Sequence, residues 1–339
     1  VCQKLVNKPK LVTSNGKEII PFSIPIAREI NPIFDTFSIL RLVFLINQIK
    51  PDVIHAHSAK GGVIARIASM FFNIKVLYTP HAFSYLSTGN KFKKFLYVTI
   101  EKILRTKNTI ILATSNSEKN QAIQAVGYEK KKVFVLKNAI DKRSIREDKD
   151  LEKILKSKTY ICTVGRPSFQ KNLEMLIRAF EIVSKKNNKV HLFIIGAGEY
   201  SPRKAKIVNM INKKNLKTRV TILPWVSRKE VQTYIKNAKL YVSSSRYEGM
   251  PYSVIESMAL SIPSVLTNTD GNRDLVIDKI SGYLVEIGDY VEMANKIMNL
   301  LNKSELRKKL AFEANKLFMQ NHLLSNYMQK LTAHYQKHS

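Results

Sequence analysis

Short apolar runs alternate with segments of helical spacing along almost the whole of this 339-residue chain. The runs have the length of buried strands, and the segments between them place apolar residues on one helix face. Such alternation indicates βαβ units and hence parallel sheets covered by helices. The chain is also longer than one ordinary hydrophobic core, which favours two domains. We therefore expect an α/β protein with two doubly wound sheets whose carboxyl ends face each other across a cleft.

The alternation occurs twice. In the first half, the expected strands cover residues 53–56, 76–79, 109–114 and 133–136, and the expected helices cover 37–49, 61–71, 91–105 and a segment from Ser117. In the second half, the strands are expected over 160–164, 190–195, 220–223, 240–243, 264–266 and 283–285, and the helices over 173–183, 205–211, 230–236, 253–260 and much of the chain beyond Tyr290. The stretch 141–158 is rich in charge and poor in apolar periodicity, so we expect a linker there.

Composition favours a globular protein in a reducing compartment. Hydrophobic residues make up 45% of the chain, which argues against disorder. The only cysteines, Cys2 and Cys162, lie far apart, so we expect no disulfide framework and a cytoplasmic location. The richest apolar stretch, 37–49, is short for a membrane span and carries Arg41. No signal peptide is recognised, and the start at Val1 suggests a chain truncated at its N-terminus.

Basic residues outnumber acidic residues by 56 to 26, which gives a formal net charge of +30 at pH 7. Such a balance makes an anionic partner worth considering. The charge is spread over both halves, so a solvated basic surface is one interpretation. Attraction to an anionic membrane surface is another, because each basic residue near such a surface adds about 1 kcal/mol. A nucleic-acid partner is not expected.

Glu248 and Glu256 bracket a turn that contains Gly249 and Pro251. Pro251 suits the first position of a helix, so the first carboxylate is expected in a loop and the second inside the helix. A phosphate could then bind the amides at the helix N-terminus, which belong to Tyr252, Ser253 and Val254. The carboxylates could accept hydrogen bonds from sugar and ribose hydroxyls, so this run predicts a sugar-nucleotide site. A side chain at Gly249 would block the approach of the loop to its ligand.

A second group of candidate residues follows the expected strand 160–164. Gly165 and Arg166 come directly after it, and Lys171 opens the next helix. Glycine permits close approach, while a guanidinium and an ammonium group would supply positive charge to a diphosphate. The alternative is that both cations are simply two of the 56 basic residues. No compact Asp and His cluster has the spacing of metal ligands, so no metal and no other cofactor is expected.

Together these motifs resemble those of the retaining glycosyltransferases of family 4, which have the GT-B fold. The run 248–256 is similar to the family's Glu-x7-Glu signature, and the run 165–172 is similar to its pyrophosphate clamp. The likeness extends to the segments 51–57 and 79–82, so it covers nearly the whole chain.

The resemblance implies roles for individual residues. Glu248 would contact the donor sugar and Glu256 the ribose hydroxyls, and His81 falls where the family has a histidine near the reacting sugar. Positive side chains would replace a metal ion in stabilising the leaving diphosphate. The expected catalytic residues are Glu248, His81, Arg166 and Lys171, and the expected donor-binding residues are Glu256, Gly249, Tyr252, Ser253, Val254, Gly165 and Trp225.

Three aromatic residues and one lysine leave alternatives open. His57 and Lys60 are candidates for the acceptor side, whereas His55 is expected in the core. We expect His55 and His57, near one strand end, to point to opposite faces of the sheet. Trp225, the only tryptophan, is expected either to stack on a base or to pack within the fold.

The resemblance also implies a domain plan. Residues 1–141 would form an acceptor-side Rossmann-like domain, 142–322 the nucleotide-sugar domain, and 323–339 a helix that crosses back to the first domain. Such proteins open with a strand and a Gly-rich loop, and nothing before Val1 supplies them. We therefore expect the N-terminal domain to lack its first strand.

The leading interpretation is a retaining transferase that moves a hexose or N-acetylhexosamine from a nucleoside diphosphate, expected to be UDP. Its acceptor would be a glycan or a lipid-linked glycan at the inner face of the cell membrane. One alternative is a UDP-sugar epimerase of similar fold, which would need no acceptor. Another is a noncatalytic protein that binds polyanions or membranes. Salt-dependent binding of polyanions, without thermal stabilisation by UDP, would favour this alternative.

Overall fold

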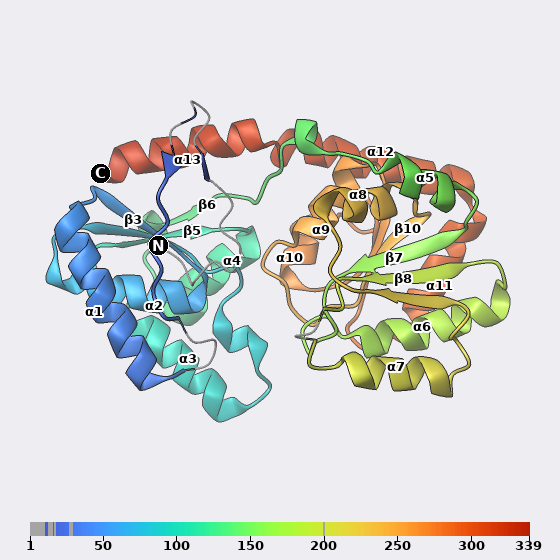
Figure 1. Ribbon diagram of the computed structural model, residues 1–339, viewed down its shortest axis with the longest axis horizontal. Helices are drawn as coiled ribbons and strands as arrows, with labels where there is room; N and C mark the ends of the chain where they lie inside the picture. Colours follow the sequence, from blue (N-terminus) through green and yellow to red (C-terminus); the bar gives the residue numbers. More distant parts are fainter. Residues whose placement is uncertain (1–10, 13–15, 17, 27–29, 199–200) are drawn as a thin grey trace. The chain divides into compact units, whose positions relative to one another are not determined.

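The computed structural model describes residues 11–12, 16, 18–26, 30–198 and 201–339. The chain divides into two compact units that alternate along the sequence. Unit 1 covers 1–113, 119–135 and 333–339, and unit 2 covers 114–118 and 136–332. Each unit has its own parallel sheet with helices packed on it (Figure 1), which confirms the expected α/β class with two parallel-sheet halves. The predicted loss of a first strand concerns residues 1–10, which lie outside the described residues.

Unit 1 is built on a four-stranded parallel sheet in the order β3-β4-β5-β6. Its strands are β3 (Val53–His57), β4 (Lys75–Thr79), β5 (Thr109–Ala113) and β6 (Val133–Val135), and a separate antiparallel pair joins β1 (Leu11–Val12) to β2 (Glu18–Ile19). Its helices and helical turns are α1 (Pro32–Ile49), α2 (Ser58–Ala68), η1 (Ser69–Phe71), η2 (Ser84–Ser87), α3 (Lys91–Ile103), η3 (Ala122–Val126) and η4 (Lys130–Lys132), and α4 (Asn116–Gln121) has its first three residues in unit 2 and the rest in unit 1. Neighbouring strands follow one another in sequence, so right-handed crossovers place α2 and α3 on one face of the sheet.

Unit 2 is built on a six-stranded parallel sheet in the order β12-β11-β10-β7-β8-β9. Its strands are β7 (Tyr160–Val164), β8 (His191–Ile195), β9 (Val220–Leu223), β10 (Leu240–Ser243), β11 (Ser264–Thr267) and β12 (Tyr283–Val285). The chain starts in the middle at β7, adds β8 and β9 on one side, and returns to add β10, β11 and β12 on the other. The strand order therefore reverses between β7 and β10, which is the switch point of a doubly wound sheet.

Helices cover both faces of the unit 2 sheet (Figure 1). One core lies under α6 (Leu173–Lys186), α7 (Lys204–Lys213) and α11 (Tyr290–Asn302). The other lies under α5 (Lys149–Lys156), α8 (Arg228–Asn237), α9 (Tyr252–Ala259) and α12 (Ser304–Asn321). The remaining helical segments are η5 (Lys142–Ser144), α10 (Asp270–Arg273) and α13 (Leu324–His338), and α13 ends in unit 1.

The sequence predicted the strands of unit 2 better than the helix ends. The bounds of β7, β9, β10 and β12 are confirmed residue for residue. Helix α1 begins five residues earlier than the predicted start at 37, because Asn31 caps it and Pro32 occupies its first turn. The oxygen of the Asn31 side chain accepts a hydrogen bond from the Phe34 amide at 3.2 Å.

The predicted linker 141–158 is wrong, because most of it is helical. Asp148 caps α5 by accepting hydrogen bonds from the amides of Asp150 and Leu151, both at 3.2 Å. Leu155 is buried in the core beneath it, and Leu151 packs against the same core. These two leucines have helical spacing, but the charged residues between them obscured the pattern.

A buried ion pair organises the core of unit 1. Arg66 of α2 lies 2.9 Å from Glu101 of α3, and neither side chain is exposed beyond 2%. The hydroxyl of the buried Tyr78 donates a hydrogen bond to Glu101 at 3.0 Å, which fixes the Tyr78 ring against Gly62 of α2. Because a buried charge is costly without a partner, each of these groups depends on the others.

Replacement of Gly62 by alanine is expected to destabilise unit 1 by about 1–3 kcal/mol through overpacking. A Cβ at this position would lie 2.2 Å from the Tyr78 ring, whereas a Cβ at Gly61 would lie 3.8 Å from its nearest neighbour. Gly61→Ala is thus the matched control and should leave stability equal or slightly higher, since alanine favours a helix. Urea unfolding of both variants measures the difference, and equal midpoints would contradict the packing described here.

Candidate functional site

The candidate site of unit 2 lies at the switch point between β7 and β10. Ligands of open parallel sheets bind outside the carboxyl ends of the strands at such a point. Strand β7 ends at Val164 and leads directly into Gly165 and Arg166. Strand β10 ends at Ser243 and leads into the loop that carries Glu248. The fold therefore brings together the two sequence runs that predicted a site.

An ion pair between Lys171 and Glu248 connects the two runs. The Lys171 Nζ lies 2.6 Å from the Glu248 Oε1, and the carboxylate is buried. Gly165 has a φ of +148°, and a Cβ there would lie 2.8 Å from the Lys171 Cε. The missing side chain at Gly165 thus lets the lysine cross the end of β7. Gly165 also lines the pocket described below, so its predicted contact with a donor stays a prediction.

Both carboxylate oxygens of Glu248 accept hydrogen bonds. Its Oε1 accepts from the Ser245 hydroxyl at 2.7 Å as well as from Lys171, and its Oε2 accepts from the Gln170 amide at 3.2 Å. A carboxylate has about four acceptor positions, so roughly one is left for a ligand hydroxyl. Sequence reasoning missed Gln170 and Ser245, whose only signal was their closeness in sequence to Lys171 and Glu248.

The loop after Glu248 is held from both sides. The amide of Gly271 donates to the Glu248 carbonyl at 3.2 Å, and the Asn138 side chain donates to the Met250 carbonyl at 2.8 Å. A Cβ at Gly271 would lie 2.4 Å from the carbonyl oxygen of Gly249, so the two backbones are in direct contact. This contact fixes the loop in front of α9.

Helix α9 begins at Tyr252, one residue before the predicted start at 253, and Pro251 precedes it instead of occupying its first position. Pro251 is its N-cap with extended backbone. The Val254 amide donates to the Pro251 carbonyl at 3.2 Å, so the prediction that it points free from the helix end is wrong. The amides of Tyr252 and Ser253 still have no acceptor within the helix, as at any helix start. The Ser253 hydroxyl accepts a hydrogen bond from Tyr241 at 2.7 Å.

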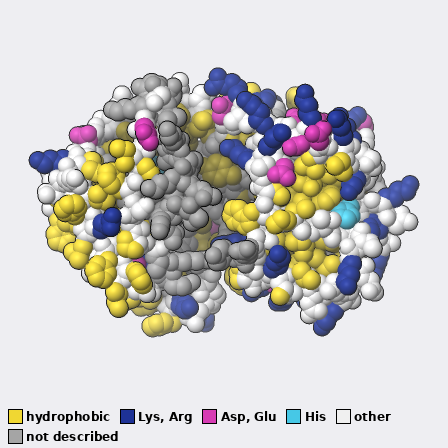
Figure 2. All heavy atoms as spheres, viewed as in Figure 1, with side chains coloured by type: hydrophobic (Ala, Val, Ile, Leu, Met, Phe, Trp, Pro, Cys, Tyr) yellow, Lys and Arg dark blue, Asp and Glu magenta, His cyan; other side chains and the backbone are white. Residues whose placement is uncertain are grey.

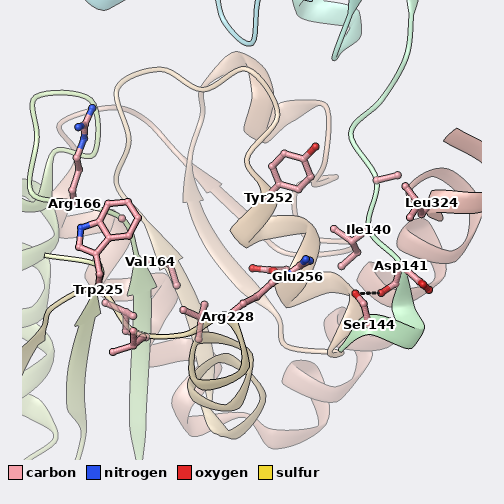
Figure 3. A pocket seen from close by; sticks show the side chains of 16 residues that line it. Ile140, Asp141, Ser144, Val164, Arg166, Trp225, Arg228, Tyr252, Glu256 and Leu324 are labelled. Carbon is pink, nitrogen blue, oxygen red and sulfur yellow. Dashed lines mark hydrogen bonds and ion pairs between the residues drawn. The ribbon is translucent and has the colours of Figure 1, made fainter. Parts of the chain in front are cut away.

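A pocket of about 970 Å³ opens at this end of the sheet (Figure 3). In Figure 3, Arg166 and Trp225 lie on one side of it, Asp141 and Ser144 lie on the other, and Glu256 lies between. The volume is at the upper end of the range for small-molecule sites. Further lining residues include Gly165, Arg228 and Tyr252, together with Ile140, Gly196 and Leu324.

Trp225 lies at the surface of this pocket. Its side chain is 76% exposed. A Cβ at Gly198 would lie 1.9 Å from the indole ring, so the ring occupies the space that a side chain at that position would need. An exposed aromatic face over a pocket can stack on a flat ligand such as a base.

Glu256 is a buried acid that faces the pocket. Burial raises the pKa of the Glu256 carboxyl, although Arg228 and Gln232 act in the opposite direction. The Arg228 Nε lies 3.3 Å from the carboxylate. Sequence reasoning missed Arg228, but a signal was present: Ser227 and Glu230 form a capping box, which places Arg228 in the first turn of α8.

The candidate residues of unit 1 lie at the carboxyl ends of β3 and β4. His57 Nδ1 and His81 Nε2 are 3.1 Å apart, so one ring donates a hydrogen bond to the other. Burial lowers the pKa of His57, and burial with the charge of His57 lowers the pKa of His81 to about 4. Both rings are therefore neutral at pH 7. His81 and Ala82 have φ values of +55° and +76°, a strained conformation that is typical of functional sites.

The prediction that His55 and His57 point to opposite faces is wrong. Their ring centroids are 4.1 Å apart, because residues two apart in a strand lie on the same face. His55 hydrogen-bonds to Tyr335 and Thr79, each at 2.9 Å, so it has a structural role. Lys60 forms an ion pair with Asp35 at 2.8 Å.

Within the described part of the chain, no group of three or more His, Cys, Asp and Glu side chains is arranged to hold a metal ion. The positive groups at the unit 2 site are the side chains of Arg166, Lys171 and Arg228. Such an arrangement can bind a diphosphate and stabilise charge on it.

Residues 144–317 match the family of glycosyl transferases group 1, and residues 8–143 match glycosyltransferase family 4. The chain is 28% identical to the UDP-Gal:alpha-D-GlcNAc-diphosphoundecaprenol alpha-1,3-galactosyltransferase of Escherichia coli, over 84% of this chain and 77% of that protein. It is 29% identical to the capsular polysaccharide biosynthesis glycosyltransferase CapM of Staphylococcus aureus, over 90% of this chain and 83% of that protein. The structure of Anabaena HepE in complex with UDP-glucose aligns with a TM-score of 0.79 at 18% identity, over 91% of this chain and 84% of HepE.

The chain belongs to the group 1 glycosyltransferases of family 4. Its two parallel-sheet units have the GT-B fold, and the resemblance inferred from the motifs is confirmed.

Replacement of Glu256 by glutamine is expected to raise the free energy of unfolding at pH 7 measurably. The reason is that a raised pKa makes the ionised carboxylate less stable in the folded chain than in the unfolded chain. The gain should disappear as the pH falls through 4.5, the ordinary value, because the wild-type carboxyl is then protonated in both states. Urea unfolding of the wild type and the variant at pH 7 and pH 4 measures this difference in stability.

Glu305→Gln in α12 is the control, because the Glu305 side chain is 84% exposed and Lys308 holds its pKa low. Its effect at pH 7 should be negligible or of opposite sign. A Glu256→Gln variant less stable than wild type at pH 7 would contradict the assignment of a destabilised carboxylate.

Proposed function

We propose that this glycosyltransferase is a retaining enzyme that moves a hexose or N-acetylhexosamine from a UDP-sugar to a lipid-linked glycan or other glycan acceptor. The proposal rests on one observation: at the unit 2 switch point, Arg166, Arg228, Glu256 and the exposed Trp225 line one pocket, and the ion pair of Lys171 with Glu248 lies beside Gly165 at its edge. Each group fits one part of a sugar nucleotide.

The diphosphate would bind between the cations. Arg166 lines the pocket, and Lys171 lies behind Gly165 at its edge. The first amides of α9 add donors at the positive end of a helix. In the reaction, the bond between the sugar C1 and the diphosphate oxygen breaks, and the electron pair stays on UDP. Positive groups fixed in place stabilise this charge without reorganising, so we propose that the reaction needs no metal.

The nucleoside would occupy the other end of the pocket. The exposed face of Trp225 suits the uracil ring, and the Glu256 carboxylate suits the ribose hydroxyls. The base is proposed to be uracil because the E. coli relative is named for UDP-Gal and HepE was solved with UDP-glucose.

Glu248 would face the donor sugar. Lys171, Gln170 and Ser245 fix its orientation and leave about one acceptor position for a sugar hydroxyl. A single hydroxyl contact can set which epimer binds well, since an unpaired polar group in a buried site is costly. The assignment of Gly249 as a loop residue that permits this approach remains part of the proposal.

The acceptor would be handled by unit 1. The hydroxyl that attacks C1 must lose its proton as the new bond forms, and the neutral His57–His81 pair offers a base and a donor. Lys60, near the start of α2, is proposed to lie on the acceptor side and is held by Asp35. A lipid-linked acceptor is supported by the diphosphoundecaprenol substrate in the name of the E. coli relative. With such an acceptor, we propose that the enzyme acts in the cytoplasm at the inner face of the membrane.

Replacement of Arg166 by alanine is expected to reduce kcat/KM for transfer by about 100- to 1000-fold, the usual loss when one oxyanion-stabilising group is removed. Arg178→Ala is the matched control, because Arg178 is an exposed arginine of α6 outside the pocket. The assay combines the purified protein with a panel of UDP-sugars and a membrane lipid extract, and identifies products by mass. Turnover of the Arg166 variant at the Arg178 variant's level would contradict the proposal.

The glycosidic product is expected to keep the anomeric configuration of the donor sugar. NMR of the product bond gives the configuration directly. An inverted bond would overturn the retaining mechanism but not the transfer, whereas an altered UDP-sugar formed without any acceptor would point to epimerisation.

A further inference from the structure

Helix α3 presents its apolar face outward. Phe92, Phe95, Leu96 and Ile103 lie at positions i, i+3, i+4 and i+11, which is one face of a helix. Phe92 is 75% exposed, Phe95 70% and Ile103 71%. Four large apolar side chains in one stripe are more than the scattered exposure of a soluble surface.

The opposite face of α3 packs on the core through Tyr97 and Val98, and it also carries a charged residue inward. Glu101 is buried and pairs with Arg66 of α2. A surface helix normally has the reverse arrangement, with apolar residues inside and charged residues outside. The buried ion pair thus helps to anchor α3 to unit 1, and the four apolar side chains of the outer stripe are left for another partner.

Helix α1 repeats this pattern. Ile33, Phe37, Leu40 and Phe44 lie at positions i, i+4, i+7 and i+11, and each is at least 60% exposed. Its other face packs into the core of unit 1 through buried residues such as Leu45. By length and composition alone α1 could also cross a membrane, but its buried face favours a helix that belongs to the folded unit.

The two stripes lie on the same side of unit 1. Helix α1 packs on α2, and α2 and α3 are successive crossovers on one face of the sheet. The end of α13 covers the other face, where His334 contacts Phe134 of β6. Figure 2 shows hydrophobic side chains gathered on unit 1, in the region where Figure 1 places α1. We call the eight side chains of the two stripes the α1–α3 face.

Unpaired positive charge borders this face. Lys91, Lys93 and Lys94 stand in the first turn of α3, which contains no acid. They oppose the helix dipole there, which is unfavourable for the helix itself. Among the ion pairs of the described residues, none involves these three lysines. Their position is explained if they meet negative charge outside the molecule.

We propose that the α1–α3 face docks this protein on an anionic phospholipid bilayer. Its aromatic and aliphatic side chains would enter the boundary between headgroups and acyl chains, and the lysines of α3 would contact lipid phosphates. A second copy of the chain fits less well, because it carries the same formal net charge of +30 and offers the lysines no excess of negative charge. Docking on a bilayer would bring the enzyme to a lipid-linked acceptor, so this surface rests on the proposed function. Its binding to a bilayer can still be measured without any glycosyl transfer.

The test is cosedimentation of the whole chain with vesicles of phosphatidylcholine, with and without phosphatidylglycerol. Phe92→Ser is expected to reduce the partition coefficient for anionic vesicles by roughly tenfold. Phe312→Ser is the matched control, because Phe312 is a 68% exposed phenylalanine of α12 in unit 2. It should bind as wild type does.

A second pair of variants isolates the charge. Lys93→Gln with Lys94→Gln should weaken binding by about tenfold, whereas Lys308→Gln with Lys309→Gln, two adjacent lysines of α12, should have little effect. Thermal stabilisation by UDP, equal in all four variants, shows that each is folded and that the donor site is intact.

Three results would overturn the docking surface. They are equal vesicle binding by the Phe92 and Phe312 variants, binding that does not depend on phosphatidylglycerol, and a stable dimer that Phe92→Ser converts to a monomer without altering vesicle binding. The protein could bind vesicles as expected and yet show neither thermal stabilisation by UDP nor glycosyl transfer. That result would support the docking surface and contradict the proposed function.

Discussion

The ion pair between Lys171 and Glu248 is the interaction on which the unit 2 site depends. It joins the segment after β7 to the segment after β10, the two neighbours between which the strand order reverses. A buried carboxylate without a positive partner would be strongly destabilising, and the path that Lys171 takes to Glu248 uses the space left by the missing side chain of Gly165. One glycine, one lysine and one glutamate therefore set the geometry at the mouth of the sheet, and Gln170 and Ser245 complete it.

The same pair links the two halves of the proposed chemistry. Lys171 is shared between an acid that would hold the donor sugar and a diphosphate that would leave from that sugar. A cation already held by Glu248 loses little freedom when a phosphate arrives, so its contribution to stabilising the leaving group is available without rearrangement. Glu256 differs from Glu248 in this respect. Burial raises the pKa of its carboxyl, so keeping this acid in the pocket lowers the stability of the folded chain at neutral pH.

Periodicity predicted the parts of the fold in which apolar residues are continuous. Strands such as β7 and β10 are wholly buried runs with clear ends, so their bounds followed from the sequence. Helix α5 did not, because charged residues separate its leucines, and the start of α1 was missed although Asn31 and Pro32 mark it. In the site, Arg166 and Glu256 were found because their motifs are local. Gln170 and Arg228 were not, since their roles arise only when distant segments meet in space.

The contact between Trp225 and Gly198 has a consequence for how nucleotide preference could change in relatives of this protein. The indole lies where any larger residue at position 198 would place its first carbon atom. A methyl group added there would force the indole ring to move and would thereby change the width of the pocket that Trp225 lines. With Trp225 stacked on the base as proposed, selectivity for the size of a purine or a pyrimidine would shift through residue 198, which does not itself line the pocket, and every charged group of the pocket would stay in place.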